Sequence, residues 1–341
     1  MEVVTATLIK ILAGMPHLAI LLVGLFLAKL FFQVTSRYKF SEELTAKDNP
    51  AFGVCLSGYL VGTGIALYGA LFGATGILTE DAAGILVGVV AIIILMRLGV
   101  VVNDAAILFR FSIRKELSHD RNVGTGFVVA GSCIATGWML NGVLSGVSTS
   151  LLTSIRDIVV YWALGQVILI LGGILFQFIT RYDVHKIIGG ENNLPAGISF
   201  GGFLVALGII TRNALFGATS RLGEEILITI IFALVGMVLL TLTRIIADRV
   251  FLPGSPLSKE IAEDRNPAAG AIAAASFVVA ALIFAAAVNP HPTPVIAVEP
   301  QASTIEAPAL EPESAMETAP VVGLTAPETT TEQPPERPAE P

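Results

Sequence analysis

Four asparagines at nearly constant spacing show that the chain is built from a repeated unit. They are separated by 73, 71 and 73 residues, and each opens a long apolar run: Asn49, Asn122, Asn193 and Asn266. A glycine follows four residues after each of them, at Gly53, Gly126, Gly197 and Gly270. A shift of 144 residues also aligns Ala70 through Thr75 with Ala214 through Thr219. A unit of about 72 residues is therefore doubled twice, and this repeat governs any fold the chain adopts.

The composition places the repeats in a membrane. The chain is 54% hydrophobic and 14% charged, with a mean hydropathy of +0.79, which is typical of a polytopic membrane protein. Its net charge of −7 comes almost wholly from residues 289–341, which hold nine glutamates and a single arginine, Arg337. Because the remainder is nearly neutral, nucleic acid is not expected as a partner.

Eight apolar stretches are long enough to cross a bilayer as helices, which requires about 20 residues each. They lie at roughly 16–35, 50–73, 82–108, 123–146, 155–180, 195–217, 225–248 and 267–288. The stretches pair into four hairpins, one in each repeat. We therefore predict an all-α, polytopic membrane protein with two homologous four-helix halves, residues 1–145 and 146–288.

The joins between the spans alternate between short and long. The long joins are basic: Arg37–Asp48, Arg110–Arg121, Arg181–Glu191 and Arg249–Arg265. The short ones, such as the join from Gly73 to Glu80, are poor in positive charge. By the positive-inside rule the long joins are cytoplasmic, and both termini lie outside the cytoplasm. We refer to the two sides of the predicted bundle as the long-join end and the short-join end.

The four repeated asparagines allow two interpretations. Asparagine suits the N-cap of a helix, because its side chain accepts hydrogen bonds from free backbone N–H groups. Pro50 and Pro267 follow at the first helical position, where a missing N–H has no effect. Helix capping is the favoured interpretation, and a polar ring at a cytoplasmic mouth is the alternative.

Glycines with four-residue spacing predict close helix packing in spans two, four and six. Small residues let helix backbones approach where lipid offers no hydrophobic drive for association. We expect these spans to form the inner helices, with spans one, three, five and seven outside them. The same glycine faces would also allow copies of the chain to associate as a homo-oligomer. The residues are Gly58, Gly62, Gly69, Gly73, Gly142, Gly146, Gly197 and Gly201.

The third repeat carries a recognisable motif. Thr180-Arg181-Tyr182-Asp183, followed by Asn193 and by Ile198 through Gly202, resembles the membrane family called domain of unknown function 350. The resemblance covers roughly residues 17–288, although the second repeat has Phe111 where the tyrosine is expected. It implies a bacterial inner-membrane protein built from hairpins, and it implies no activity.

Ionisable residues within the spans are the candidate functional residues, because charge is costly in a membrane and usually faces a bundle interior or cavity. Asp104 and Asp248 occupy equivalent positions near the long-join end, and Arg97 and Arg244 lie on the same two spans. One interpretation is that these side chains snorkel to the headgroups and pair there. The other is a paired acidic cation site on a pseudo-two-fold axis, as carboxylates provide in channels and transporters built from repeats.

Enzyme chemistry is not expected. The sequence has no HExxH, no Gly-x-Ser-x-Gly elbow and no Cys/His cluster, so we predict no catalytic, metal or cofactor site. Residues 289–341 hold 12 of the 18 prolines and should form a disordered tail. That tail either solvates the protein or reaches a periplasmic or cell-wall partner.

Two functional classes remain from the sequence, both for a protein embedded in the lipid bilayer. The first is a cation permeation or transport protein. The second is a non-catalytic scaffold, which would oligomerise through its glycine-rich faces and recruit partners through its joins or tail.

Overall fold

The computed structural model describes residues 1–72, 77–146, 150–216, 221–252 and 254–288, and within these ranges it is helical with no strand. The predicted tail, residues 289–341, lies outside the described residues. Eight helices in the described chain are long and apolar enough to cross a membrane, as predicted. They are α1 (Glu2–Thr35), α2 (Pro50–Gly69), α3 (Leu78–Val102), α5 (Val123–Leu144), α6 (Leu151–Ile179), α7 (Leu194–Leu215), α8 (Leu222–Val250) and α10 (Pro267–Ala287).

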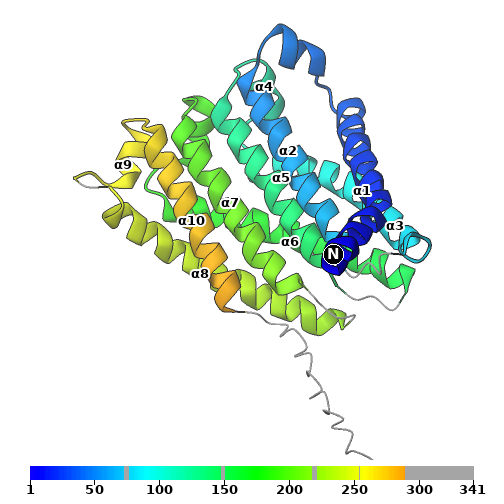
Figure 1. The fold of residues 1–341 in the computed structure, drawn as a ribbon. Helices are drawn as coiled ribbons and strands as arrows, with labels where there is room; N and C mark the ends of the chain where they lie inside the picture. Colours follow the sequence, from blue (N-terminus) through cyan, green and yellow to red (C-terminus); the bar gives the residue numbers. More distant parts are fainter. Residues whose placement is uncertain (73–76, 147–149, 217–220, 253, 289–341) are drawn as a thin grey trace, which may run out of the picture. The chain divides into compact units, whose positions relative to one another are not determined.

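The eight long helices form two layers (Figure 1). The inner layer is a row in the order α2, α5, α7, α10, and the outer layer follows the order α1, α3, α6, α8. The spans predicted to lie inside are therefore the inner helices, and the predicted outer spans cover them. The last span, α10, ends the inner row. Each repeat supplies one helix to each layer.

The glycine that follows each asparagine fixes the spacing of the inner row. A Cβ at Gly126 would lie 2.6 Å from the backbone oxygen of Ala51 on α2, and one at Gly270 would lie 2.6 Å from Cα of Pro195 on α7. Gly197 meets the backbone of Gly124 on α5 in the same way. A Cβ at Gly53 would meet nothing within 4 Å, because α2 is the first helix of the row. The repeated glycine therefore packs each repeat against the one before it.

The other glycines singled out in the sequence also pack within the chain. Gly58, Gly62 and Gly69 approach the α5 backbone at Ala130, Cys133 and Asn141, while Gly142 approaches Arg212 and Gly201 approaches Phe127. Gly146 lines a cavity described below, and Gly73 lies outside the described residues. Close backbone approach over small residues thus holds the inner layer together.

The first span is longer than predicted. The sequence suggested a start near residue 16, whereas α1 begins at Glu2 and contains Pro16. Residues 3–15 are largely apolar, so the helix continues through the proline, which membrane helices tolerate.

Short helices at the long-join end connect the two layers. They are the π-helical turns η1 (Glu42–Ala46), η2 (Asn103–Ile107) and η3 (Lys186–Gly190) and the α-helices α4 (Ile113–Ser118) and α9 (Leu257–Ala262). The chain then reaches each asparagine through a residue with positive φ, between 47° and 53°: Asp48, Arg121, Asn192 and Arg265. This repeated left-handed turn sets the direction in which each inner helix starts.

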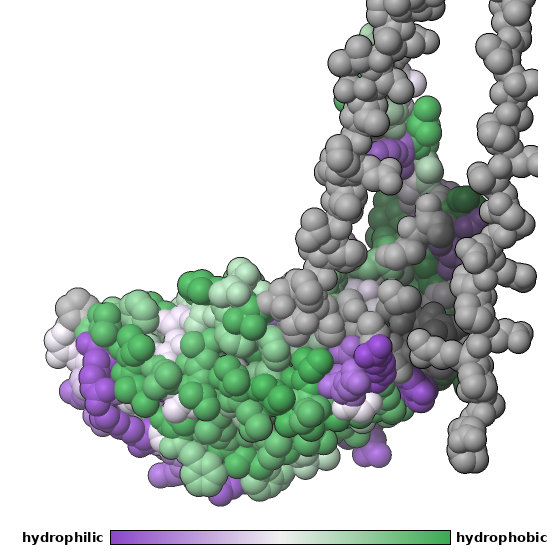
Figure 2. All heavy atoms as spheres, turned by 90° about the horizontal axis from the view of Figure 1, so that it is seen from below, coloured by the Kyte–Doolittle hydropathy of each residue, from purple (hydrophilic) through white to green (hydrophobic). Residues whose placement is uncertain are grey.

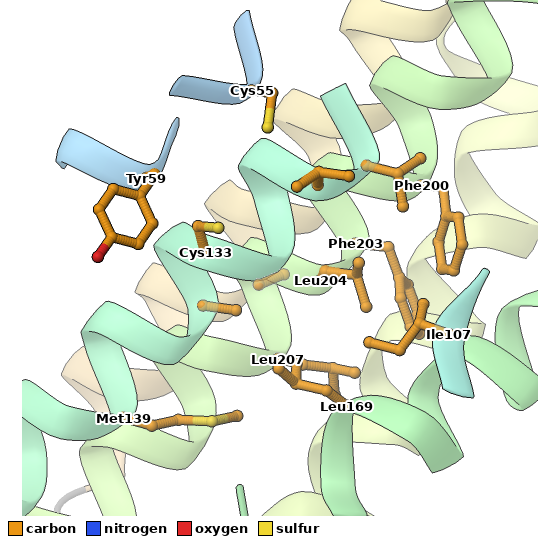
Figure 3. Packing of buried hydrophobic residues seen from close by; sticks show 14 of the residues in the cluster. Cys55, Tyr59, Ile107, Cys133, Met139, Leu169, Phe200, Phe203, Leu204 and Leu207 are labelled. Atoms are coloured by element: carbon orange, nitrogen blue, oxygen red, sulfur yellow. The ribbon is translucent and has the colours of Figure 1, made fainter. Parts of the chain in front are cut away.

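The core lies between the layers and along the inner row. Figure 3 shows Cys55 and Tyr59 of α2 near Cys133 of α5, and Phe203 and Leu207 of α7 facing Leu169 of α6 and Ile107. Figure 2 shows a broad apolar surface with hydrophilic residues along its margin, as expected for a protein that contacts lipid.

Candidate functional site

The four repeated asparagines are N-caps of the inner helices. The side-chain oxygen of Asn49 accepts from the backbone N–H of Ala51 and Phe52, and the other three accept from the first turn of their own helices. Because the inner helices form a row, the asparagines lie in a line along the long-join end and not in a ring.

The amide nitrogens of the first three asparagines also join neighbouring repeats. Nδ2 of Asn49 donates to the carbonyl oxygen of Leu117, and Nδ2 of Asn122 donates to that of Ile188. Asn193 donates in the same way to Ile261. The asparagine side chain therefore links the start of one inner helix to the join of the next repeat, which gives it a structural role that capping alone does not require.

Asn122→Asp should destabilise the protein by about 2 kcal/mol or more, although aspartate is as good an N-cap as asparagine. The change removes both Nδ2 donor bonds and puts a carboxylate beside Glu116 Oε2, which now accepts from Nδ2 at 2.8 Å. Burial raises the pKa of Glu116, and the hydrogen bond from Asn122 opposes that rise. Thermal unfolding in detergent measures the effect. A stability equal to wild type would contradict the link between repeats.

The two matched acids cap short helices in the joins. Asp104 Oδ1 accepts from the backbone N–H of Ile113, the first residue of α4, at 3.1 Å. Asp248 Oδ1 accepts from the backbone N–H of Ser258 on α9 at 2.7 Å. The structure does not bring the two acids together, because they lie on α3–η2 and on α8, with α6 between them in the outer layer.

The two span arginines have different surroundings. Arg97 is half-buried, and it donates to the hydroxyl and carbonyl oxygens of Thr35 at the end of α1. Arg244 is buried and donates to Ser258 Oγ at 2.8 Å. Neither arginine forms an ion pair within 4.0 Å among the described residues. The structure thus divides the sequence-predicted cation site: Arg244 and Asp248 meet at Ser258, whereas Asp104 lies in the other half of the chain and bonds to its own join.

An acidic cavity of about 260 Å³ opens at the short-join end, between the starts of α3 and α6 and the ends of α2 and α5. Glu80, Asp81 and Asp157 line it, and the last two carboxylates are buried. Asp81 pairs with buried His17 of α1 at 3.0 Å, and Asp157 pairs with the guanidinium of Arg156 at 2.7 Å.

Buried polar side chains occupy the seam where α3, α5 and α6 meet. Gln166 lies near the middle of the 29-residue α6, and its Nε2 donates to Thr136 Oγ1 of α5 at 3.3 Å. A Cβ at Gly99 of α3 would lie 3.4 Å from Thr136 and 3.8 Å from Gln166 Oε1. Asn103, the first residue of η2, and Ser132 on α5 lie one helical turn further towards the long-join end.

Several of these seam atoms have no hydrogen-bond partner within the described part of the chain. They are Gln166 Oε1, Ser132 Oγ and both side-chain polar atoms of Asn103. Unpaired buried polar groups are rare in proteins and call for water, an ion or a functional role. The seam therefore brings several unpaired polar atoms together between the two layers.

Sequence reasoning missed the seam because it searched the spans for charge. Gln166, Thr136 and Asn103 are neutral, and His17 lies at the edge of the first predicted span, 16–35. For the acidic cavity, the sequence did offer one signal. The 144-residue shift aligns Asp81 with Glu225 and His17 with Tyr161. An acid at the position of Asp81 is thus found in both halves, whereas Asp157 aligns with Ala13 and the histidine is found in the first half alone.

Comparison with known proteins gives a family and no activity. The family model described as Domain of Unknown Function (DUF350) matches the chain twice, over residues 5–144 and 150–288. No curated protein and no solved structure matches the chain significantly.

Proposed function

This chain belongs to the family described as Domain of Unknown Function (DUF350), and that membership assigns no activity. We propose that the chain is a cation permeation or transport protein. The proposed path enters at the acidic cavity and follows the α3–α5–α6 seam. With the long joins in the cytoplasm of a bacterial cell, the cavity opens to the outer side of the inner membrane.

The acidic cavity is the observation that carries the proposal. Asp81 and Asp157 are buried, and both line a space large enough for several waters. Carboxylates in a low-dielectric recess concentrate cations, and acids at channel entrances select them. The buried pair of His17 and Asp81 is also the type of group that carries protons in membrane proteins.

The seam supports the same function further along the path. Oxygen atoms without partners, such as Gln166 Oε1 and Ser132 Oγ in the described chain, can replace part of the hydration shell of a cation. Gly99 places no side chain against Thr136 and Gln166, where a Cβ would already be in van der Waals contact. Apolar residues of the cavity wall, Ile85 and Ile158, precede the seam residues Gly99 and Gln166 along α3 and α6, and they suit a gate that opens by wetting.

Cation uptake by proteoliposomes that contain the purified full chain tests the proposal. Separate indicators report H⁺, Na⁺, K⁺ and Mg²⁺, with protein-free vesicles as the control. We expect uptake of at least one of these ions above the control. Uptake of none of them, by protein shown to be folded, would contradict the proposal.

A membrane scaffold is the second candidate, and one observation favours it. A broad apolar hollow of about 670 Å³ on the inner layer is lined by residues of α2, α5, α7 and α10 alone, among them Ser57, Phe127 and Ile198. Such a face suits a second copy of the chain. The molar mass of the detergent-solubilised protein distinguishes the candidates, since a scaffold of this kind should be at least a dimer that Phe127→Ser dissociates.

A further inference from the structure

A second pocket lies at the long-join end, apart from the proposed cation path. It encloses about 150 Å³ between the end of α6, the last two turns of α8 and the start of α9. Its wall contains three arginines, Arg181, Arg244 and Arg249, together with Asp248 and Ser258. Three guanidinium groups against one carboxylate leave the pocket with a net positive charge.

Arg244 shows that this pocket is incomplete without a ligand. Its side chain is only 2% exposed, and Nη2 donates to Ser258 Oγ at 2.8 Å. Nη1 has no hydrogen-bond partner among the residues that the structure describes. A guanidinium is always charged and carries five N–H donors, so a buried one requires acceptors.

Asp248 does not meet that requirement. Its Oδ1 accepts from the backbone N–H and the hydroxyl of Ser258, at 2.7 and 2.6 Å, and its Oδ2 lies 3.8 Å from Arg181 Nη2. The carboxylate thus holds the start of α9 in place and leaves Arg244 Nη1 and the outward-facing arginines for another anion.

We propose that this pocket binds the phosphate group of an anionic phospholipid. Arginine forks match phosphate oxygens in geometry and charge. The pocket lies where a headgroup would meet the protein, because Ile179 and Ile245 also line it and Ile245 is 45% exposed on the outer surface of α8. Basic residues at this side of a membrane protein attract anionic headgroups.

The first half of the chain provides an internal comparison. Under the 144-residue shift, Arg244 and Arg249 align with Val100 and Ala105, while Asp248 aligns with Asp104. The acid that caps the join helix is therefore kept in both halves, whereas two of the three arginines occur in the second half alone. The bond to the join helix explains why an acid is present in both halves, but it does not explain Arg244 and Arg249.

Native mass spectrometry of the full chain in detergent tests the proposal. The probes are phosphatidylglycerol, phosphatidylcholine with the same acyl chains, and inorganic phosphate. The variants are Arg244→Gln and the double variant Arg181→Gln/Arg249→Gln, whose side chains are exposed and whose folding is checked by thermal unfolding. Lys259→Gln is the control, because it removes an exposed positive charge of α9 that does not line the pocket.

We expect wild type and Lys259→Gln to retain phosphatidylglycerol, and the double variant to retain it about tenfold less, as the loss of charge-assisted hydrogen bonds predicts. Retention within about twofold of wild type in the folded arginine variants would overturn the site. A different outcome is that inorganic phosphate stabilises the protein as much as phosphatidylglycerol does, with the effect lost in the same variants. That result would assign the pocket to soluble phosphate and overturn the proposal of a lipid ligand.

Discussion

Gly137→Ala should destabilise the protein by about 3 kcal/mol or more and leave little of it folded. Gly137 of α5 faces α2, and a Cβ there would lie 2.6 Å from Cα of Gly62 and closer still to its backbone oxygen. Because the obstructing atoms are backbone, neither helix relieves the overlap by changing a rotamer. The two helices must separate, which disturbs the α2–α5 contact along its length. Thermal unfolding and the yield of monodisperse protein in detergent measure the effect.

Gly64→Ala is the matched control for this change. Gly64 lies on α2, two residues from Gly62, and an added methyl group would meet nothing within 4 Å. We expect its unfolding temperature to stay close to that of wild type. Equal stability of the two variants would show that the inner layer does not depend on backbone contact.

Gln166→Leu should lower cation uptake about tenfold or more while lowering the free energy of unfolding by only about 1 kcal/mol. Leucine fills a similar volume and removes Oε1, which has no partner within the described chain. The change also removes the hydrogen bond from Gln166 Nε2 to Thr136 Oγ1, and the net loss of one such bond costs about 1 kcal/mol. An apolar side chain beside Gly99 and Thr136 would dehydrate the seam.

Measuring both stability and cation uptake makes this variant informative. If Gln166 had only a structural role, its replacement would not lower uptake by a protein that stays folded. Thr63→Val is its control, since Thr63 is buried on α2 away from the seam and its hydroxyl already bonds to the carbonyl oxygen of Tyr59. Normal uptake by Gln166→Leu would remove the seam from the path.

The sequence predicted the helices and their layers well because both follow from strong, local signals. Apolar length defines a span, and the repeated asparagine defines where each inner helix begins. The glycine four residues later marks a close helix contact, but the neighbouring helix is identified only when the order of the inner row is known. That order depends on tertiary packing, which spacing alone does not encode.

The candidate site was less predictable for a physical reason. Asp104 and Asp248 stand out in a hydropathy profile, yet each satisfies its charge with a backbone N–H of its own join. The seam consists of neutral side chains from α3, α5 and α6, which are distant in sequence. A glutamine or a threonine inside an apolar span gives no signal until the helices around it are placed.

Cation uptake in two double variants, measured side by side, tests the central claim most directly. Asp81→Asn/Asp157→Asn removes the buried charges of the cavity, and Asp104→Asn/Asp248→Asn removes those of the join caps. We expect the first variant to retain less than about one tenth of wild-type uptake, because the entrance loses its attraction for cations. The second should retain most of its uptake if it remains folded. Uptake that survives in the first variant and is lost in the folded second one would contradict the proposed path.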